Sequence, residues 1–277
     1  MKKTLLLACI CCAFCACNNV EKQAAVKLQE ARQAYESGDY NQAKILIDSI
    51  KILYPKAYET RKAGIGLMQE VELKEQEKTL HYLDSLLQQK QQQLDAMKNA
   101  YTFEKDAEYQ RIGRYLHPSQ VIEKNLHRSF LRFQVDENGL MSLTSIYCGA
   151  RNIHHTAVKV STPDGIFAQT PPSKDSYETT DLGEKIEKAD YKMGEDGDVI
   201  NFLYANKDKN IRVDYIGERP YSTTLTANDR KAVVSVYELA QVLSAITEIK
   251  KNIEEAKLKS DFVKKKMEER KAKAKEE

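Results

Sequence analysis

The stretch VELKEQEKTLHYLDSLLQQKQQQLDAMKNAY, residues 71–101, decides how the chain folds. Apolar side chains recur in it every seven residues, which is the repeat of a coiled-coil seam along one stripe of a helix. One row holds Leu73, Leu80, Leu87, Leu94 and Tyr101, and the alternate row holds Leu83 and Met97 but is interrupted by Gln76 and Lys90. The stretch therefore predicts one long helix whose apolar stripe needs a partner.

The C-terminal segment supplies a matching seam. Its two rows are Leu239, Ile246, Ile253, Ser260 and Met267, and Val242, Ile249, Ala256 and Val263. Residues 250–277 carry 11 basic and 7 acidic side chains, a net charge of +4, whereas residues 70–84 carry 5 acidic and 2 basic side chains, a net charge of −3. Opposite charges favour an antiparallel pair within one chain, in which Leu87 lies beside Ile253.

The segment between the two helices changes to strand-like patterns. Residues 130–135 alternate, residues 136–139 (Asp-Glu-Asn-Gly) form a turn and residues 140–148 return, so we expect a hairpin. We also expect a strand at residues 158–160 and a second hairpin from residues 199–204 and 211–216. Short strands joined by turns predict a small antiparallel sheet or sandwich. Thr226 or Asn228 can cap the final helix, with Asp229 in its first turn.

These patterns together define a fold class. A chain of 277 residues has room for one or two domains. We predict an α+β fold with an N-terminal helical hairpin, a long antiparallel coiled-coil helix pair and an inserted antiparallel β-rich domain. The expected segments are a signal peptide at residues 1–16, the hairpin at 17–56, the first long helix at 57–101, the β-rich domain at 102–226 and the C-terminal helix at 227–277.

The first residues are typical of an export signal. Lys2 and Lys3 are positive, and residues 5–14 form an apolar run too short to span a bilayer as a mature helix. The sequence Phe14-Cys15-Ala16-Cys17 resembles the lipobox of bacterial lipoproteins, although Phe14 departs from the usual Leu, Val or Ile. The resemblance implies cleavage before Cys17 and lipidation of Cys17, which anchors a protein to a membrane; the alternative is an ordinary signal peptide cut nearby. Because no acidic cluster follows, we expect an outer-membrane lipoprotein that faces the periplasm.

The chain after the leader predicts two short helices. Ser37-Gly38-Asp39 breaks the first helix and Pro55 stops the second. The sequence AYESGDYNQA, residues 34–43, together with Pro55 resembles a tetratricopeptide repeat, although Lys27 and Glu30 stand where that repeat has bulky apolar residues. One copy cannot bury its own face, so the following helix is expected to cover it. The resemblance implies a groove for an extended peptide, and the alternative is a helical packing module.

The composition limits the function classes. The chain has 43 basic and 41 acidic residues, a balance that gives no general attraction to nucleic acid, so we expect no nucleic-acid partner. Five of the six cysteines lie at positions 9, 11, 12, 15 and 17, and only Cys148 lies in the body of the chain. Neither a disulfide framework nor a cysteine metal cluster is therefore expected.

The residues that might do chemistry form no spaced catalytic set. His154 and His155 are adjacent, and adjacent side chains on a strand point to opposite faces, so we interpret them as a loop pair that alanine can replace with the fold nearly intact. Cys148 is interpreted as a small buried residue, and Asp196-Gly197-Asp198 as a turn rather than a calcium loop. The sequence has no Walker loop, GxGxxG or GxSxG motif. We expect no catalytic, cofactor-binding or metal site, and no cofactor.

The sequence thus predicts a non-catalytic, lipid-anchored envelope protein, a scaffold or adaptor that presents a β-rich head on a coiled-coil stalk to a protein partner. The alternative is a ligand-binding or hydrolytic head on the same stalk. The tyrosines that might line a peptide or glycan surface are Tyr147, Tyr177, Tyr204, Tyr215 and Tyr221. A pocket with convergent ionisable side chains would favour the alternative, and a convex head would favour the scaffold.

Overall fold

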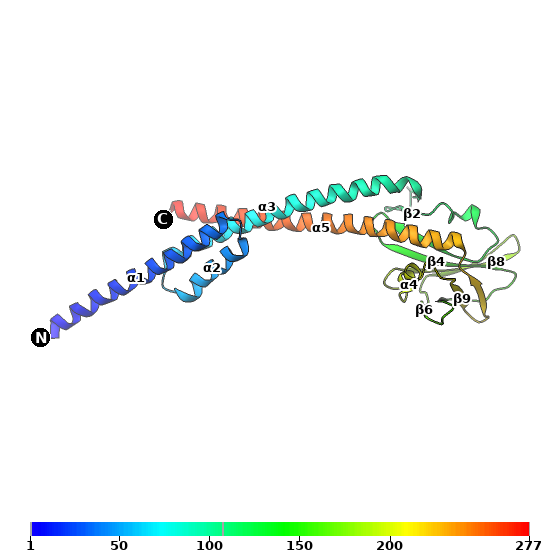
Figure 1. Ribbon diagram of the computed structural model, residues 1–277, viewed down its shortest axis with the longest axis horizontal. Coiled ribbons are helices and arrows are strands. Elements are labelled where there is room, and N and C mark those ends of the chain that lie inside the picture. Colours follow the sequence, from blue (N-terminus) through cyan, green and yellow to red (C-terminus); the bar gives the residue numbers. More distant parts are fainter. Residues whose placement is uncertain (1, 107, 277) are drawn as a thin grey trace. The chain divides into compact units, whose positions relative to one another are not determined.

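The computed structural model describes residues 2–106 and 108–276, with side chains described from Asn19 to Lys275 except Ala107. The chain divides into a helical unit, Met1–Ser85 with Lys251–Glu277, and a head unit, Leu86–Lys250. The described residues form five α-helices and two antiparallel sheets (Figure 1). The predicted α+β class, the β-rich region and the long C-terminal helix are confirmed.

The helical unit begins with α1 (Lys2–Glu36) and α2 (Tyr40–Leu53), which pack against each other. The chain breaks between them where the sequence predicts it, because Gly38 adopts a left-handed φ of 82° and Asp39 then caps α2 by accepting the Gln42 N–H at 3.0 Å. Ala43, Ile47 and Ile50 are the buried residues of α2. Their spacing places them on one face of the helix.

Contacts in the helical unit tie the start of α3 (Tyr58–Met97) to its neighbours. The Glu21 carboxylate of α1 accepts both the backbone N–H and the hydroxyl of Thr60 at 2.7 Å. Lys44 of α2 forms an ion pair with Glu75 at 2.8 Å. Gly66 of α3 lies so close to α5 (Ala227–Glu276) that an added Cβ would be 2.7 Å from a guanidinium nitrogen of Arg270. The start of α3 is thus held by side chains of α1, α2 and α5.

The head unit contains a six-stranded and a four-stranded antiparallel sheet (Figure 1). In spatial order the first holds β1 (Thr102–Glu104), β2 (Arg114–Leu116), β3 (Phe130–Asp136), β4 (Met141–Gly149), β8 (Glu184–Lys192) and β7 (Ser176–Asp181). The second holds β10 (Tyr221–Thr224), β9 (Arg212–Ile216), β5 (Ala157–Ser161) and β6 (Phe167–Gln169). The predicted hairpin is the β3–β4 pair, in which Phe133 lies opposite Leu143.

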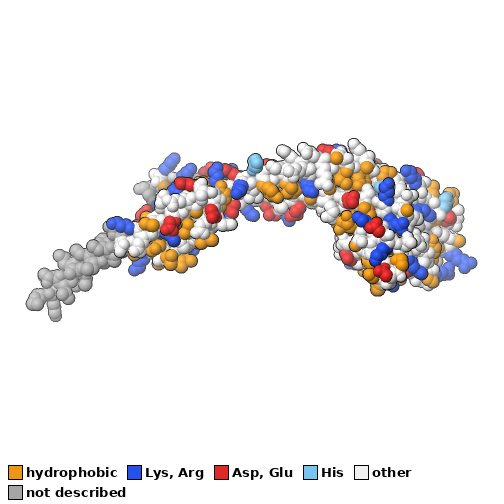
Figure 2. Space-filling model, viewed as in Figure 1, with side chains coloured by type: hydrophobic (Ala, Val, Ile, Leu, Met, Phe, Trp, Pro, Cys, Tyr) orange, Lys and Arg blue, Asp and Glu red, His pale blue; other side chains and the backbone are white. Residues whose placement is uncertain are grey.

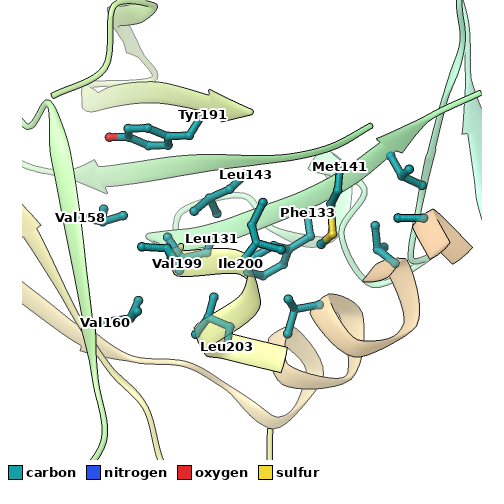
Figure 3. Packing of buried hydrophobic residues seen from close by; sticks show 14 of the residues in the cluster. Leu131, Phe133, Met141, Leu143, Val158, Val160, Tyr191, Val199, Ile200 and Leu203 are labelled. Atoms are coloured by element: carbon teal, nitrogen blue, oxygen red, sulfur yellow. The ribbon is translucent and has the colours of Figure 1, made fainter. Parts of the chain in front are cut away.

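The core of the head unit draws side chains from both sheets, from α4 (Val199–Ala205) and from the first half of α5 (Figure 3). Phe133 and Leu143 enter it from the six-stranded sheet, and Val160 enters it from the four-stranded sheet. Leu94 of α3 belongs to the same buried cluster as Ile246 of α5. Burial of such side chains supplies the main stabilisation, at roughly 25 cal/mol per Å² of apolar surface.

One strand prediction is wrong, because residues 199–204 form α4. The Asp196 carboxylate accepts the backbone N–H of Ile200 at 2.7 Å, which satisfies a donor in the first turn. Val199, Ile200 and Leu203 are all buried, a spacing that fits one side of a helix. A short apolar run cannot be assigned to helix or strand by periodicity alone, and here the local turn at Asp196-Gly197-Asp198 decides it.

The helix α5 begins where the sequence predicts, since the Thr226 hydroxyl accepts the Asp229 N–H at 3.1 Å. Its buried residues keep the expected heptad spacing over most of its length. They include Leu239, Val242, Ile246, Ile249, Ile253, Ala256, Ser260 and Val263. Among the described residues, α5 is the one helix long and apolar enough to cross a membrane, but half of its apolar window is buried inside the protein, as in a core helix.

Candidate functional site

The two histidines lie in the loop that joins β4 to β5, as predicted, but they have different surroundings. His154 is half exposed, whereas the His155 side chain is completely buried. The His155 ring contacts a Glu187 oxygen through Nδ1 at 3.0 Å and the Ser145 hydroxyl through Nε2 at 2.8 Å. Replacing His155 by alanine would leave both buried partners short of a hydrogen bond, so we expect a clear loss of stability, contrary to the sequence-based expectation.

Glu187 organises this loop from strand β8, with its side chain 1% exposed. One carboxylate oxygen accepts the backbone N–H groups of Ile153 at 2.7 Å and His154 at 3.0 Å. The other accepts the backbone N–H of His155 at 2.9 Å as well as its ring. Burial by itself raises the pKa of the Glu187 carboxyl, but these hydrogen bonds outweigh it and hold that pKa below the usual value. Glu187 therefore stays ionised and clamps the connection between the two sheets.

Ser145, His155 and Glu187 are hydrogen-bonded in the order hydroxyl, imidazole and carboxylate, as in serine hydrolases. A nucleophile must reach its substrate, yet these residues are 0%, 3% and 1% exposed. The hydroxyl also contacts the Ala189 carbonyl at 3.4 Å. The arrangement satisfies three buried polar groups and has no open face for a substrate.

His154, Glu178 and Glu187 have ligand atoms within 4.8 Å of one another, which is the spacing of a candidate metal site. Each Glu187 oxygen already accepts two hydrogen bonds, however, and Glu178 is engaged by His154 at 2.9 Å and by the Asn152 amide at 2.9 Å. The hydrogen bond with Glu178 raises the pKa of His154, so its ring tends to hold a proton. A metal ion would have to displace several donors at once.

A pocket of about 400 Å³ lies elsewhere on the head unit. Strand alternation places it on the face of the six-stranded sheet that points away from the core, because Tyr147 and Glu187 are buried and their neighbours point the other way. Ile146, Cys148 and Ile186 line it from β4 and β8. The remaining apolar lining comes from Ile122, Leu126, Phe130 and Leu182. Polar and charged side chains share the lining, among them Arg128, Asp181 and Lys188, so the pocket is mixed in character and open to solvent.

A small ionisable cluster sits in this pocket. The Cys148 thiol donates to a Glu184 oxygen at 3.4 Å, and His127 bonds to the same oxygen. Burial and the neighbouring Glu184 raise the pKa of the Cys148 thiol to about 11. The hydrogen bond from His127, and then the one from Cys148, lower the pKa of Glu184. At neutral pH the pocket therefore presents a thiol and a carboxylate, not the thiolate that a cysteine nucleophile needs.

Backbone strain is concentrated at the same pocket. The structure describes four non-glycine residues with positive φ, and two of them, His127 at 60° and Leu182 at 48°, line the pocket. Leu182 and Gly183 form the two-residue loop between β7 and β8, a turn in which Asn-Gly is the favoured sequence. Leu182 is a bulky residue in a left-handed conformation, and its side chain is also 86% exposed. Such outliers are typical of functional positions.

The other residues singled out in the sequence have these surroundings. Cys148 is only half buried and lines the pocket, which corrects its interpretation as a buried residue. Tyr177 is 61% exposed on β7. The other four tyrosines lie in aromatic contacts, Tyr147, Tyr215 and Tyr221 with one another and Tyr204 against Tyr237. The side chain of Cys17 lies outside the described side chains.

Sequence reasoning missed Ser145, Glu187 and the Leu182 loop. A signal existed for the first two, because each is a polar residue at a core-facing position of an alternating strand. Ser145 lies between Leu143 and Tyr147 on β4, and Glu187 lies two residues before Ala189 on β8. Asp181-Leu182-Gly183-Glu184 carried a weaker signal, a Leu where a tight hairpin prefers Asn or Asp.

In comparisons with known proteins, no family model, curated protein or solved structure matches the chain. The exposed, strained pocket on the six-stranded sheet is the candidate site.

Glu187→Gln should destabilise the head by about 2–4 kcal/mol, because the amide NH₂ must face backbone donors in a buried site. The folded-state pKa of Glu187 lies below its usual 4.5, so its stabilisation is present above that value and is lost as the pH falls through the folded-state pKa. The difference in free energy of unfolding between wild type and variant, measured with urea, should be largest at pH 7 and should shrink below about pH 4.5. Glu178→Gln, whose side chain is 42% exposed, is the control and should change stability by less than about 0.5 kcal/mol. An equal effect of both variants would contradict the clamp.

Leu182→Asn should raise the free energy of unfolding by about 0.5–1 kcal/mol, because Asn tolerates the left-handed conformation and little burial is lost. Leu126→Asn removes a second exposed apolar side chain of the pocket at a residue without positive φ, so it should give no gain. Thermal unfolding of both variants provides the measurement. A loss of stability in Leu182→Asn would show that the leucine serves the fold rather than a partner.

Proposed function

We propose that the protein is a non-catalytic, lipid-anchored adaptor of the cell envelope whose head binds a protein partner at the pocket lined by Leu182. The observation that carries this proposal is Leu182 itself, an 86% exposed apolar residue with a left-handed backbone at the edge of the pocket. Because Leu182 is so exposed, its side chain contributes little burial to the fold. A partner that covers the leucine would gain the free energy of burying an apolar side chain.

Two observations support a binding role over a hydrolytic one. The Cys148 thiol has a pKa of about 11 and lies beside a carboxylate, which disfavours the thiolate further. The Ser145 hydroxyl is sealed in the core. The hydroxyl and thiol with the most suggestive neighbours are thus either closed to substrate or poorly activated.

A small-molecule ligand is the second candidate occupant. The convergence of His127, Cys148 and Glu184 in a pocket of about 400 Å³ favours it, because such pockets combine an apolar lining with a few placed polar groups. The protein partner accounts in addition for Leu182, whose side chain projects from the hairpin tip into solvent.

The proposed anchor is Cys17, in an outer-membrane lipoprotein that faces the periplasm. Support comes from the apolar run and from Ala16-Cys17 in the sequence. The tetratricopeptide-like hairpin is proposed as a packing module at the base, because Ala31, Ala43 and Leu67 join one buried cluster.

We further propose that α3 and α5 form one antiparallel coiled coil. Within the helical unit, Gly66 of α3 approaches Arg270 of α5. Within the head unit, the Tyr101 hydroxyl that follows α3 donates to the Ser235 carbonyl of α5 at 2.8 Å. The beginning of α3 thus contacts the end of α5, and Tyr101, just after the end of α3, contacts the beginning of α5. Antiparallel pairing requires this order.

Site-specific photo-crosslinking in intact cells tests the adaptor function. A photoreactive phenylalanine analogue in place of Leu126, at the pocket, should give a defined adduct with another envelope protein. The same analogue in place of Ile166, which is 55% exposed in the β5–β6 turn, is the control and should give none. Adduct formation at both positions, or at neither, would contradict a partner site at the pocket.

The double variant Leu87→Cys/Ile253→Cys tests the coiled coil. Facing seam positions can reach the Cα separation of about 4.4–6.8 Å that a disulfide needs, so oxidation should close an intramolecular bond. Non-reducing electrophoresis and mass spectrometry of the mature protein report it. Leu87→Cys with Leu258→Cys, a 69% exposed position on α5, is the control and should stay reduced. A crosslink found only between chains would show that the helices serve a homo-oligomer.

A further inference from the structure

The connection between α2 and α3 exposes a group of apolar side chains in the helical unit. Ile52, Leu53 and Tyr58 are 76%, 60% and 70% exposed. Figure 2 shows hydrophobic side chains gathered on the surface of the helical unit over α2. Scattered single apolar residues are ordinary on protein surfaces, but three around one short turn form a patch that calls for an explanation.

This turn packs against the part of α1 around Glu21 and Ala24. The carboxylate of Glu21 accepts both hydrogen bonds from Thr60, and Ala24 of α1 shares a buried cluster with Ile50 and Ala57. Cys17 precedes Glu21 by four residues, which is about one helical turn or about 6 Å along α1. The apolar patch therefore lies at the end of the helical unit where the proposed lipid anchor begins.

The charge around the patch is positive. Residues 51–62 contain the cations Lys51, Lys56, Arg61 and Lys62 and a single anion, Glu59, a net charge of +3. Lys51 and Lys56 are exposed on either side of Leu53. Basic residues interleaved with exposed apolar ones are the pattern of a surface that lies in the interface of a membrane with anionic lipids.

An apolar groove continues the patch. It lies between α2 and α3, has a volume of about 730 Å³, and is lined by Ile47, Tyr58, Arg61, Ile65 and Met68 among others. Ile65 is itself 58% exposed. The apolar surface at this end therefore extends beyond the turn, and three basic side chains (Lys51, Arg61 and Lys62) and two acidic ones (Asp48 and Glu72) lie in the lining of the groove.

We propose that the α2–α3 turn, with Ile52, Leu53 and Tyr58 as its apolar contacts, docks on an anionic lipid surface. The place of this surface beside the anchor rests on the proposed lipidation of Cys17, whereas its affinity for lipid rests on the exposed side chains alone. A lipid chain holds the protein at the membrane but leaves its direction free. The second contact fixes the helical unit against the bilayer, since apolar insertion and basic residues act together.

Tryptophan fluorescence provides a direct test, because the chain contains no Trp. The mature lipidated protein with Ile52→Trp is reconstituted in vesicles that contain anionic lipid. The matched control is Tyr82→Trp, a 64% exposed position about 36 Å further along α3 in the same unit. Ile52→Trp should emit at shorter wavelength and be quenched several-fold more strongly by brominated lipids than Tyr82→Trp.

Replacing Lys51 and Lys56 by Gln in the Ile52→Trp protein should weaken the contact about fivefold per lysine on anionic vesicles, and much less on neutral ones. Equal, water-like emission and equal quenching at positions 52 and 82 would overturn the lipid-docking proposal. That outcome would hold against it even if a protein binds the same surface. Loss of the mature protein from vesicles in a high-salt wash would instead contradict the lipid anchor. In that case a blue shift of Ile52→Trp on addition of anionic vesicles at low salt still supports the surface, and its absence overturns it.

Discussion

The carboxylate of Glu187 is the interaction on which the head unit depends. It binds the N–H groups of three successive residues, 153 to 155, in the loop that carries the chain from the six-stranded sheet to the four-stranded sheet. A buried charge of this kind is stable only when its hydrogen bonds are complete, and here the His155 ring supplies the last of them. The relative placement of the two sheets is thus tied to one side chain on β8.

The same strands also build the candidate site on the opposite face. Cys148 of β4 lies directly opposite Ile186 of β8, and both line the pocket, while Glu187 next to Ile186 points into the core. The alternation of a strand therefore gives one face a fully hydrogen-bonded polar clamp and the other an open pocket. A rigid sheet beneath an adaptable rim of loops is a usual arrangement for a binding site. Leu182 belongs to that rim, and its strain is supported by the hairpin of β7 and β8.

Much of this architecture could be predicted from the sequence, because the spacing of apolar residues differs between helices and strands. The heptads indicated α3 and α5, and the alternation around Asp136-Glu137-Asn138-Gly139 indicated β3 and β4. The assignment of residues 199–204 failed because a short buried apolar run fits a helix and a strand equally well, and the carboxylate of Asp196 decided the outcome. The clamp and the pocket could not be predicted in the same way, since Ser145 and Glu187 are far apart in sequence and only the fold brings both to His155.

The two units of the chain have separate proposed tasks. We propose that the helical unit attaches to a membrane and that the head unit binds a partner through the exposed Leu182. The most direct measurement is the yield of the photo-crosslink from position 126 when the chain also carries Leu182→Asn. Covering one leucine side chain contributes about 1.5–3 kcal/mol, so we expect the yield to fall about tenfold or more while the melting temperature does not fall. An unchanged yield with a stably folded head would contradict this proposal.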